Sequence, residues 1–385
     1  MNYIPIATVF FSLGAVMRYS SFQNPRKNWS NIDILFTKEG RHEIEKLFPN
    51  VFPLVDWPEL REFFDKREKV ALNVKRRNHY CGVAAVLTGV LGLSILSFVP
   101  WLSNYIAHDG LTLMAIGLLA TGILLGLWMR FVSSAPRTWL VNRFWAERVR
   151  QFQFQYFVSH LPQMAEAMVS EDKIQAWLAA RAEAFRQLAF DASQNPVGVY
   201  EAVVADNAGK KCWLECAGPM KVTLPSRSPE RDKLISYLKR LRVGYQLQYA
   251  RSQNLAANIY SKKAMAAFAT KAIFGLIVAF VLISLIIAVL ILSKPVDPVV
   301  MSLLFGVQGL VAAMIAGVRV MEEGLAWRAE ATRYIVYEAG LTLAEEKAGS
   351  ISDDEIAEGL MAVEKLAYDE LRGFLIAHRD PRFII

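Results

Sequence analysis

Four long runs of apolar residues divide the chain: Tyr80–Ser103, Leu111–Met129, Ala272–Ser293 and Val299–Val318. Each is close to the roughly 20 residues that a helix needs to cross the hydrocarbon core of a bilayer. The links within each pair are short, NYIAHDG in the first and KPVDP in the second. The pattern therefore predicts four transmembrane helices arranged as two tight hairpins.

A shorter apolar run, IPIATVFFSLGAVM at residues 4–17, lies near the N-terminus. It has the length of a signal segment, but no basic region precedes it. A translocated N-terminus would also conflict with the basic residues at 66–77. We interpret the run as a buried strand or helix of a soluble cap, with a signal segment as the alternative.

Basic residues gather at the outer ends of both hairpins. They are Lys66, Arg67, Lys69, Lys75, Arg76 and Arg77 before the first run, Arg130, Arg137 and Arg143 after the second, Lys262, Lys263 and Lys271 before the third, and Arg319 and Arg328 after the fourth. The two hairpin tips hold only Lys294. By the positive-inside rule, both termini and the central segment are expected in the cytoplasm.

Composition agrees with this organisation. Of the 385 residues, 54% are hydrophobic and 21% are charged, a mixture typical of membrane segments joined to a water-exposed part. Most of the net charge of +7 lies beside the apolar runs, where topology and anionic lipid headgroups explain it better than nucleic acid does. We therefore expect a lipid bilayer as partner and no binding to nucleic-acid polymers. The odd number of cysteines, three, argues against a disulfide framework.

A short motif recurs after both hairpins. Trp145, Glu147 and Arg150 follow the first in RFWAERVRQFQFQYF, and Trp327, Glu330 and Arg333 follow the second in WRAEATRYIVY. A Glu and an Arg three residues apart share one helix face and can pair. The stripe Val149, Phe152 and Tyr156 at helical spacing is matched by Thr332, Ile335 and Ala339. Each hairpin is therefore expected to continue into a cytosolic helix with one packing face, unless the match is a chance similarity of helix-forming residues.

Charged helices are predicted to run straight into the first and third spans, over Glu62–Tyr80 and Tyr237–Ala264. The chain then consists of an N-terminal cytosolic cap (1–60), a first two-span unit with cytosolic helices (61–175), a soluble insert (176–231), a second two-span unit (232–346) and a C-terminal amphipathic helix (347–385). The last helix shows a stripe of Ile356, Leu360, Val363, Ala367, Leu371 and Phe374. This stripe predicts docking on the cytosolic bundle, with a subunit contact as the alternative.

The second unit resembles the SLATT domains, two-span membrane modules found beside bacterial conflict and antiviral systems. The matching features are Tyr237-Leu238 with Arg242, Gln246 and Tyr249, then Lys262-Lys263-Ala264, the short hairpin, and Ala329-Glu330-x-x-Arg333. The first unit is more divergent and lacks the Tyr-Leu start. The resemblance implies a tandem SLATT effector of the bacterial inner membrane. Such a protein stays inert until a cyclic nucleotide or a cytosolic sensor protein triggers it, and it then forms a homo-oligomer and breaches the membrane.

The insert is predicted to hold a small antiparallel β-meander, because the runs EAVVA, KCWLEC and MKVTL are separated by turn-like DNAGK and AGP. The fold class is thus mostly α, a polytopic membrane protein with two hairpins, long cytosolic helices and this meander. Cys212 and Cys216 lie within it, but no His is near, so small buried hydrophobes are a better interpretation than metal ligands.

The sequence offers little chemistry. It has no phosphate loop, no His-Glu-x-x-His and no Gly-x-Ser-x-Gly, so we expect no catalytic residues, no cofactor and no metal site. Within the spans, Gln308 is expected to hydrogen-bond a neighbouring helix or to line a wet cavity. Small residues at packing intervals, Gly122 with Gly126 and Ala313 with Gly317, favour close helix contact or pore lining.

Three functional hypotheses remain open from the sequence. The first is the triggered membrane effector that permeabilises the bilayer. The second is a membrane-anchored scaffold that recruits a cytosolic partner, and a small channel or transporter subunit is a third, less favoured by the scarcity of charges in the spans.

Overall fold

The computed structural model describes residues 31–105, 108–255, 261–293, 296–379 and 383, which are mostly helical and contain no strand. The predicted element at residues 4–17 lies outside them. The described chain divides into two compact units. We call the first, within 31–73, 138–255 and 332–377, the head domain, and the second, within 74–137, 261–331 and 378–383, the span unit.

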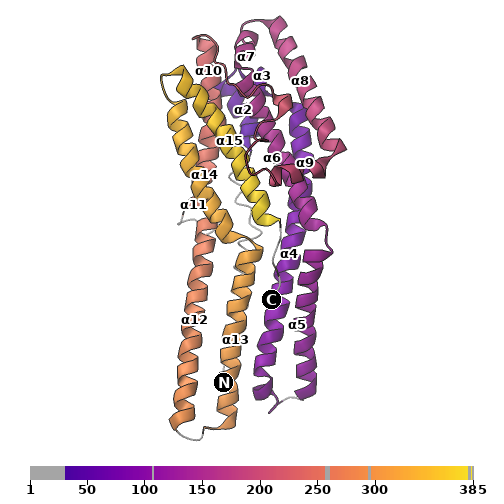
Figure 1. Ribbon diagram of the computed structural model, residues 1–385, viewed down its shortest axis with the longest axis vertical. Coiled ribbons are helices and arrows are strands. Elements are labelled where there is room, and N and C mark those ends of the chain that lie inside the picture. Colours follow the sequence, from indigo (N-terminus) through magenta and orange to yellow (C-terminus); the bar gives the residue numbers. More distant parts are fainter. Residues whose placement is uncertain (1–30, 106–107, 256–260, 294–295, 380–382, 384–385) are drawn as a thin grey trace. The chain divides into compact units, whose positions relative to one another are not determined.

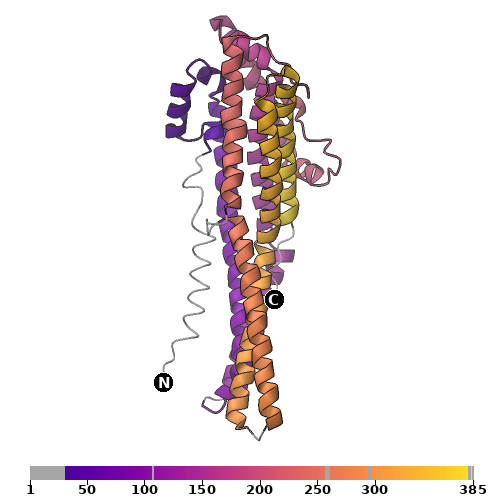
Figure 2. The same ribbon diagram turned by 90° about the vertical axis from the view of Figure 1, so that its left-hand side faces the viewer.

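Among the described residues, four helices are long and apolar enough to cross a membrane, and their apolar parts lie in the span unit: α4 (Pro58–Leu102), α5 (His108–Phe131), α12 (Lys262–Ser293) and α13 (Pro298–Gly324). This agrees with the four apolar runs of the sequence. In Figure 1 the helices stand in the order α12, α13, α4, α5, and in the view turned by 90° they largely overlap (Figure 2). The span unit is therefore a row of helices rather than a closed bundle.

Glycines let α4 approach its two neighbours in this row. A Cβ at Gly122 of α5 would lie 2.7 Å from the backbone N of Gly89 in α4, so the two backbones are almost in contact. On the other side of α4, a Cβ at Gly317 of α13 would lie 2.6 Å from Cγ2 of Val90. The first hairpin thus meets the second through α4 and α13. We call this α4–α13 contact the seam.

The head domain is built from helices that precede, join and follow the spans. They are η2 (Ile32–Ile34), α2 (Lys38–Leu47), α3 (Phe52–Val55), the first part of α4, α6 (Ala135–Ser159), α7 (Leu161–Ala167), α8 (Glu171–Gln194), α9 (Pro196–Val204), η3 (Glu215–Ala217), α10 (Pro229–Leu238), the π-helical η4 (Lys239–Gly244), α11 (Tyr245–Asn254), α14 (Trp327–Ala348) and α15 (Asp353–His378). In α15, all six residues of the predicted stripe, from Ile356 to Phe374, are buried. The last helix therefore docks through the face that its spacing predicts.

An aromatic cluster forms one core of the head domain. The ring of Trp57 lies 5.7 Å from that of Phe152 and 5.8 Å from those of Tyr156 and Phe185. Trp177 of α8 adds a further ring 5.3 Å from Tyr156. Large rings at these separations bury much apolar surface and fix the orientation of α6 against α8.

Of the helices flanking the spans, only α4 is continuous with its span. α6 begins after a break at residues 132–134, and α14 begins after Leu325 and Ala326, whose φ of 52° is left-handed. The predicted continuous helix over Tyr237–Ala264 is wrong, because α11 ends at Asn254 and α12 begins at Lys262. At that end the Asn254 amide donates to the Tyr334 carbonyl and to Glu338 of α14 instead of continuing the helix.

The predicted β-meander is also wrong. EAVVA lies in α9, and the chain that follows is irregular apart from the 3₁₀ turn η3. Buried side chains of α6, and not a neighbouring strand, hydrogen-bond the backbone of this segment. Gln155 donates to the Cys212 carbonyl (2.8 Å) and accepts from the Leu214 N–H (3.0 Å), and Ser159 donates to the Ala217 carbonyl. We call residues 206–218 the insert loop; these three backbone groups are satisfied without a sheet.

Candidate functional site

Charged side chains of α4, α6 and η2 form one connected chain inside the head domain. Arg143 lies 2.8 Å from Glu68 and also pairs with Glu147. Glu147 in turn lies 3.1 Å from Arg150, and Arg150 lies 3.2 Å from Asp33. These side chains are between 0% exposed, at Asp33, and 20% exposed, at Arg143. The alternation of sign along the chain compensates each buried charge.

The chain extends to two more helices through hydrogen bonds. Gln246 of α11 donates to Asp33 over 2.9 Å, and the Tyr337 hydroxyl of α14 donates to Gln246 over 3.5 Å. We call the set of Glu68, Arg143, Glu147, Arg150, Asp33, Gln246 and Tyr337 the polar relay. It therefore joins α4, α6, α11 and α14, each of which precedes or follows a span along the sequence.

Both arginines of the relay stay charged. Burial lowers the pKa of the Arg143 guanidinium, but the carboxylates of Glu147 and Glu68 raise it by more. The same balance, with Asp33 and Glu147 as the opposing carboxylates, raises the pKa of Arg150. Removing one carboxylate would leave a buried cation without its partner. This costs far more folding free energy than the intact pair contributes relative to apolar residues of the same size.

A second buried ion pair links η4 to α15. Arg242 binds Glu364 through two nitrogens, at 2.7 and 2.8 Å, with side chains only 3% and 1% exposed. The guanidinium also lies over the Phe154 ring, 4.7 Å from its centroid. Burial raises the pKa of Glu364, although Arg242 opposes that shift. Arg242 lies in the π-helical η4, a departure from α-helix that is frequent at functional positions.

Two further buried arginines have no carboxylate partner among the described residues. Arg148 donates to Gln151 and to the Lys211 carbonyl, and burial lowers its pKa to about 10. Arg181 donates to two backbone carbonyls, those of Leu54 and Asp56, and its pKa is also lowered to about 10 by burial. Carbonyl oxygens thus replace a carboxylate at both positions. Through these hydrogen bonds, Arg148 holds the insert loop and Arg181 holds the α3–α4 junction.

The two copies of the predicted motif differ in their surroundings. Trp145 donates from Nε1 to the Pro196 carbonyl over 3.1 Å, and Glu147 and Arg150 pair as predicted. In the second copy Trp327 is buried, and within the span unit Glu330 pairs with Lys262 and lies 3.5 Å from Nε2 of His378. In the head domain, Arg333 pairs with Glu370.

The matched stripes also differ. Val149, Phe152 and Tyr156 are at most 4% exposed. In contrast, Thr332, Ile335 and Ala339 all face outward, with Ile335 49% exposed. In the second copy the predicted stripe is therefore wrong, although the helix does have one packing face. The physical reason is that α14 packs through the opposite side, where Tyr337, Leu341 and Ala344 join Val243, Leu247, Ala250 and Val363 in a buried cluster.

The candidate residues within the spans all lie at helix contacts. Gln308 of α13 donates to the Ser284 hydroxyl of α12 over 2.7 Å, which is an interhelical hydrogen bond. Gly122 and Gly126 are buried in α5, and Gly122 approaches α4. Ala313 and Gly317 are buried in α13, and Gly317 approaches α4. Gly122 and Gly317 therefore serve helix contacts within the chain.

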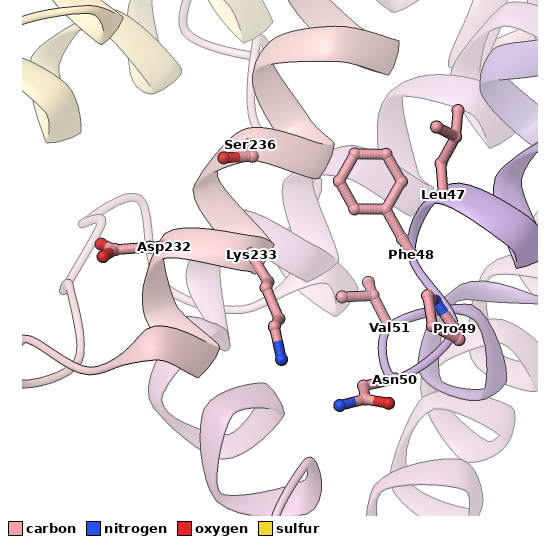
Figure 3. Close-up of a pocket in the computed structure, with 8 residues that line it drawn as sticks. All are labelled: Leu47, Phe48, Pro49, Asn50, Val51, Asp232, Lys233 and Ser236. Carbon is pink, nitrogen blue, oxygen red and sulfur yellow. The ribbon is translucent and has the colours of Figure 1, made fainter.

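One open cavity lies in the head domain, between the α2–α3 turn and α10 (Figure 3). Its volume is about 290 Å³, and its lining is formed by Leu47, Phe48, Pro49, Asn50, Val51, Asp232, Lys233 and Ser236. Asp232, Lys233 and Ser236 are all exposed, so the cavity offers no desolvated polar group. No cluster of three metal-binding side chains occurs in the described part of the chain. Burial raises the pKa of the Cys216 thiol to about 11, far from the range of a reactive thiolate.

Sequence reasoning missed most of the polar relay and the Arg242–Glu364 pair. Asp33, Gln246 and Tyr337 are distant from Arg150 along the chain, and nothing local marks them as partners. A usable signal was the run of Arg and Gln within RVRQFQFQYF, because polar residues on every face of an aromatic helix need buried partners.

Comparison with known proteins gives no match: no protein-family model, no curated protein and no solved structure matches the chain. The resemblance to SLATT domains therefore stays a prediction from its motifs. Of those motif residues, Gln246 belongs to the polar relay, Arg242 pairs with Glu364, and Tyr249 contacts Tyr334 through their hydroxyls at 3.0 Å.

Proposed function

We propose that this chain is a membrane effector of a bacterial conflict or antiviral system. It lies in the inner membrane, with the head domain and both termini in the cytoplasm. A cytosolic trigger, either a cyclic nucleotide or a sensor protein, acts on the head domain, and the protein then permeabilises the bilayer. It acts without catalysis.

The polar relay is the observation that carries this proposal. It joins helices that adjoin all four spans, so a change in its pairing alters how these helices pack in the head domain. Buried ion pairs are weak contributors to stability but enforce one arrangement over others. A trigger can shift the protein only if it binds a second arrangement more tightly than the resting one.

The row of spans supports an oligomeric active state. A row of four helices encloses no lumen, and its apolar side chains face outward, for example Phe274, Leu285 and Leu292. A water-filled path therefore needs several copies of the chain, or a rearrangement of the row. We propose a homo-oligomer for the triggered state.

The test is dye entry in cells that express the chain with its genomic neighbours and receive the trigger. Triggered cells are expected to admit a membrane-impermeant dye within minutes. Lys66→Ala, which changes an exposed pair on α4, is the control and should behave like the unaltered chain. Membranes that stay tight after triggering, with the protein present at normal level, contradict the proposal.

A second candidate function is a non-catalytic membrane-anchored scaffold. One observation favours it: α14 leaves Ile335, Val336 and Leu343 between 49% and 64% exposed. Apolar side chains grouped on a protein surface are typical of contact with another protein. Replacing the spans by an unrelated four-helix anchor separates the two candidates. A scaffold keeps its activity after the exchange, whereas an effector loses it.

A further inference from the structure

A C-terminal aromatic side chain is inserted into the seam between the hairpins. Phe383 is 2% exposed. Its ring touches the backbone of α4 at Gly82, where a Cβ would lie 2.6 Å from ring atom Cδ2. On its other side the ring touches Gly324, the last residue of α13, where a Cβ would also collide with it. The ring therefore fits only because both helices carry glycine at these positions.

The position of this ring is the end of the seam. Farther along the same two helices the contacts are direct, with Val90 against Gly317 and Phe98 against Gly306. At Gly82 and Gly324, by contrast, a residue from the C-terminus lies between the helices. Phe383 is thus a spacer that belongs to neither hairpin.

Two further observations concern this end of the seam. His378, at the end of α15, is 6% exposed and lies 3.5 Å from the buried Glu330 carboxylate, so the end of α15 also contacts the span unit's part of α14. One turn before Gly82, the Asn78 amide is buried, and neither of its polar atoms has a hydrogen-bond partner among the described residues. A buried unsatisfied amide is unfavourable, and a packing that exposes it would remove that cost.

We propose that Phe383 is a releasable wedge that holds α4 and α13 in the resting arrangement. Withdrawal of the ring frees two glycine surfaces, and the hairpins then separate or repack at this end. Phe383 lies outside the described helices, so its ring can be withdrawn without unfolding one of them. The role of this step in permeabilisation rests on the proposed function, whereas the mechanical role of the wedge does not.

The first experiment measures the seam alone. Spin labels are placed at Arg77→Cys on α4 and Arg319→Cys on α13, both exposed, in a full-length chain whose Cys81, Cys212 and Cys216 are serine, reconstituted in lipid nanodiscs. Phe383→Ala and Gly82→Ala are each expected to lengthen the label–label distance and broaden its distribution. Gly117→Ala is the matched control, since a Cβ at Gly117 of α5 meets nothing within 4 Å, and it should leave the distribution unchanged.

The second experiment measures dye entry without any trigger. Phe383→Ala is expected to raise the entry rate roughly tenfold or more, as befits loss of a large side chain packed between two helices. Phe383→Leu, which keeps an apolar side chain in the socket, is expected to raise it less. Gly82→Ala guards against a simple failure of the altered tail to fold, because it displaces the ring while leaving the tail sequence intact.

The outcomes separate the two proposals. Unchanged distances in both Phe383→Ala and Gly82→Ala overturn the wedge, even if a trigger permeabilises the membrane. Changed distances with a membrane that stays tight, with and without trigger, support the wedge and overturn the proposed function. An equal change in Gly117→Ala also overturns the wedge, because the effect would then not depend on the socket.

Discussion

The helices α6 and α14 carry the same short motif but occupy opposite kinds of environment. Every residue of α6 from Arg148 to Val158 is buried, and Arg150, Gln155 and Arg148 find partners on η2, the insert loop and α6 itself. α14 buries one side and exposes the other. The motif Glu and Arg pair with each other in α6, whereas in α14 they pair with Lys262 and Glu370. A shared sequence motif therefore does not decide whether a helix becomes a core or a surface element.

The sharpest test of this difference is to truncate a large apolar side chain at matched positions of the two helices. Phe152 in α6 and Ile335 in α14 both lie two residues after the motif arginine. Phe152→Ala leaves a cavity beside Trp57 and Phe185 and is expected to destabilise the protein by about 4 kcal/mol. Ile335→Ala, at a side chain 49% exposed, should change stability by no more than about 0.5 kcal/mol. Thermal unfolding in detergent measures both, and equal losses would contradict the distinction.

The motif arginines offer the next comparison. Arg150→Met leaves Asp33, which is 0% exposed, without its ion-pair partner, and is expected to cost about 3 kcal/mol. Arg333→Met removes a pair in which Glu370 keeps 21% exposure, so water can solvate the remaining carboxylate and the loss should stay near 1 kcal/mol. The double variant Arg150→Met with Asp33→Asn is expected to recover part of the first loss. No recovery would show that Arg150 acts through packing and not through its charge.

Gln155 tests the polar side of α6. Its amide serves the insert loop twice, at the Cys212 carbonyl and the Leu214 N–H. Gln155→Ala leaves the buried Cys212 carbonyl and the half-buried Leu214 N–H without this partner and is expected to cost about 2 kcal/mol. Hydrogen exchange of the insert loop should accelerate strongly, while exchange in α14 should not. Gln187→Ala, on an exposed face of α8, is the control and should alter neither.

The span unit could be predicted from the sequence because crossing a bilayer needs only local composition. Apolar runs of sufficient length recur four times, and Gln308 within them has few alternatives to an interhelical hydrogen bond. The C-terminal helix could be predicted for a similar reason, since its stripe repeats at helical spacing.

The head domain could not be predicted to the same degree. The insert loop has the alternating residues and turn signals of a meander, yet the donors and acceptors that satisfy it come from Gln155 and Ser159, more than fifty positions earlier. The polar relay is longer in range still, since Asp33 and Gln246 are 213 residues apart. Local pattern cannot select among such distant partners. The stripe of Thr332, Ile335 and Ala339 in α14 is a case in which the local pattern was present but its partner was not. Its helical spacing predicted a packing face, yet nothing in the described head domain covers it.

The smallest expected effect concerns the insert loop, which side chains of α6 bind, and the dependence of its stability on pH. The hydrogen bond from Tyr368 and the N–H groups of Lys211 and Lys210 lower the pKa of Asp206, at the start of the insert loop, to about 2. A depressed carboxyl pKa contributes stability that is present above the ordinary value near 4 and lost as pH falls toward 2. The insert loop should therefore loosen in that window.

Pepsin, which is active at low pH, provides the measurement. Cleavage between residues 206 and 218 is expected to rise as pH falls from about 4 to about 2, and to rise more steeply than cleavage within α14. In Asp206→Asn the side chain carries no charge at any pH, so this part of the pH dependence should disappear and the loop should be cut readily throughout. If Asp206→Asn kept the steep rise, another carboxyl group would control the loop, and Arg148 and Gln155 of α6 would hold it without help from Asp206.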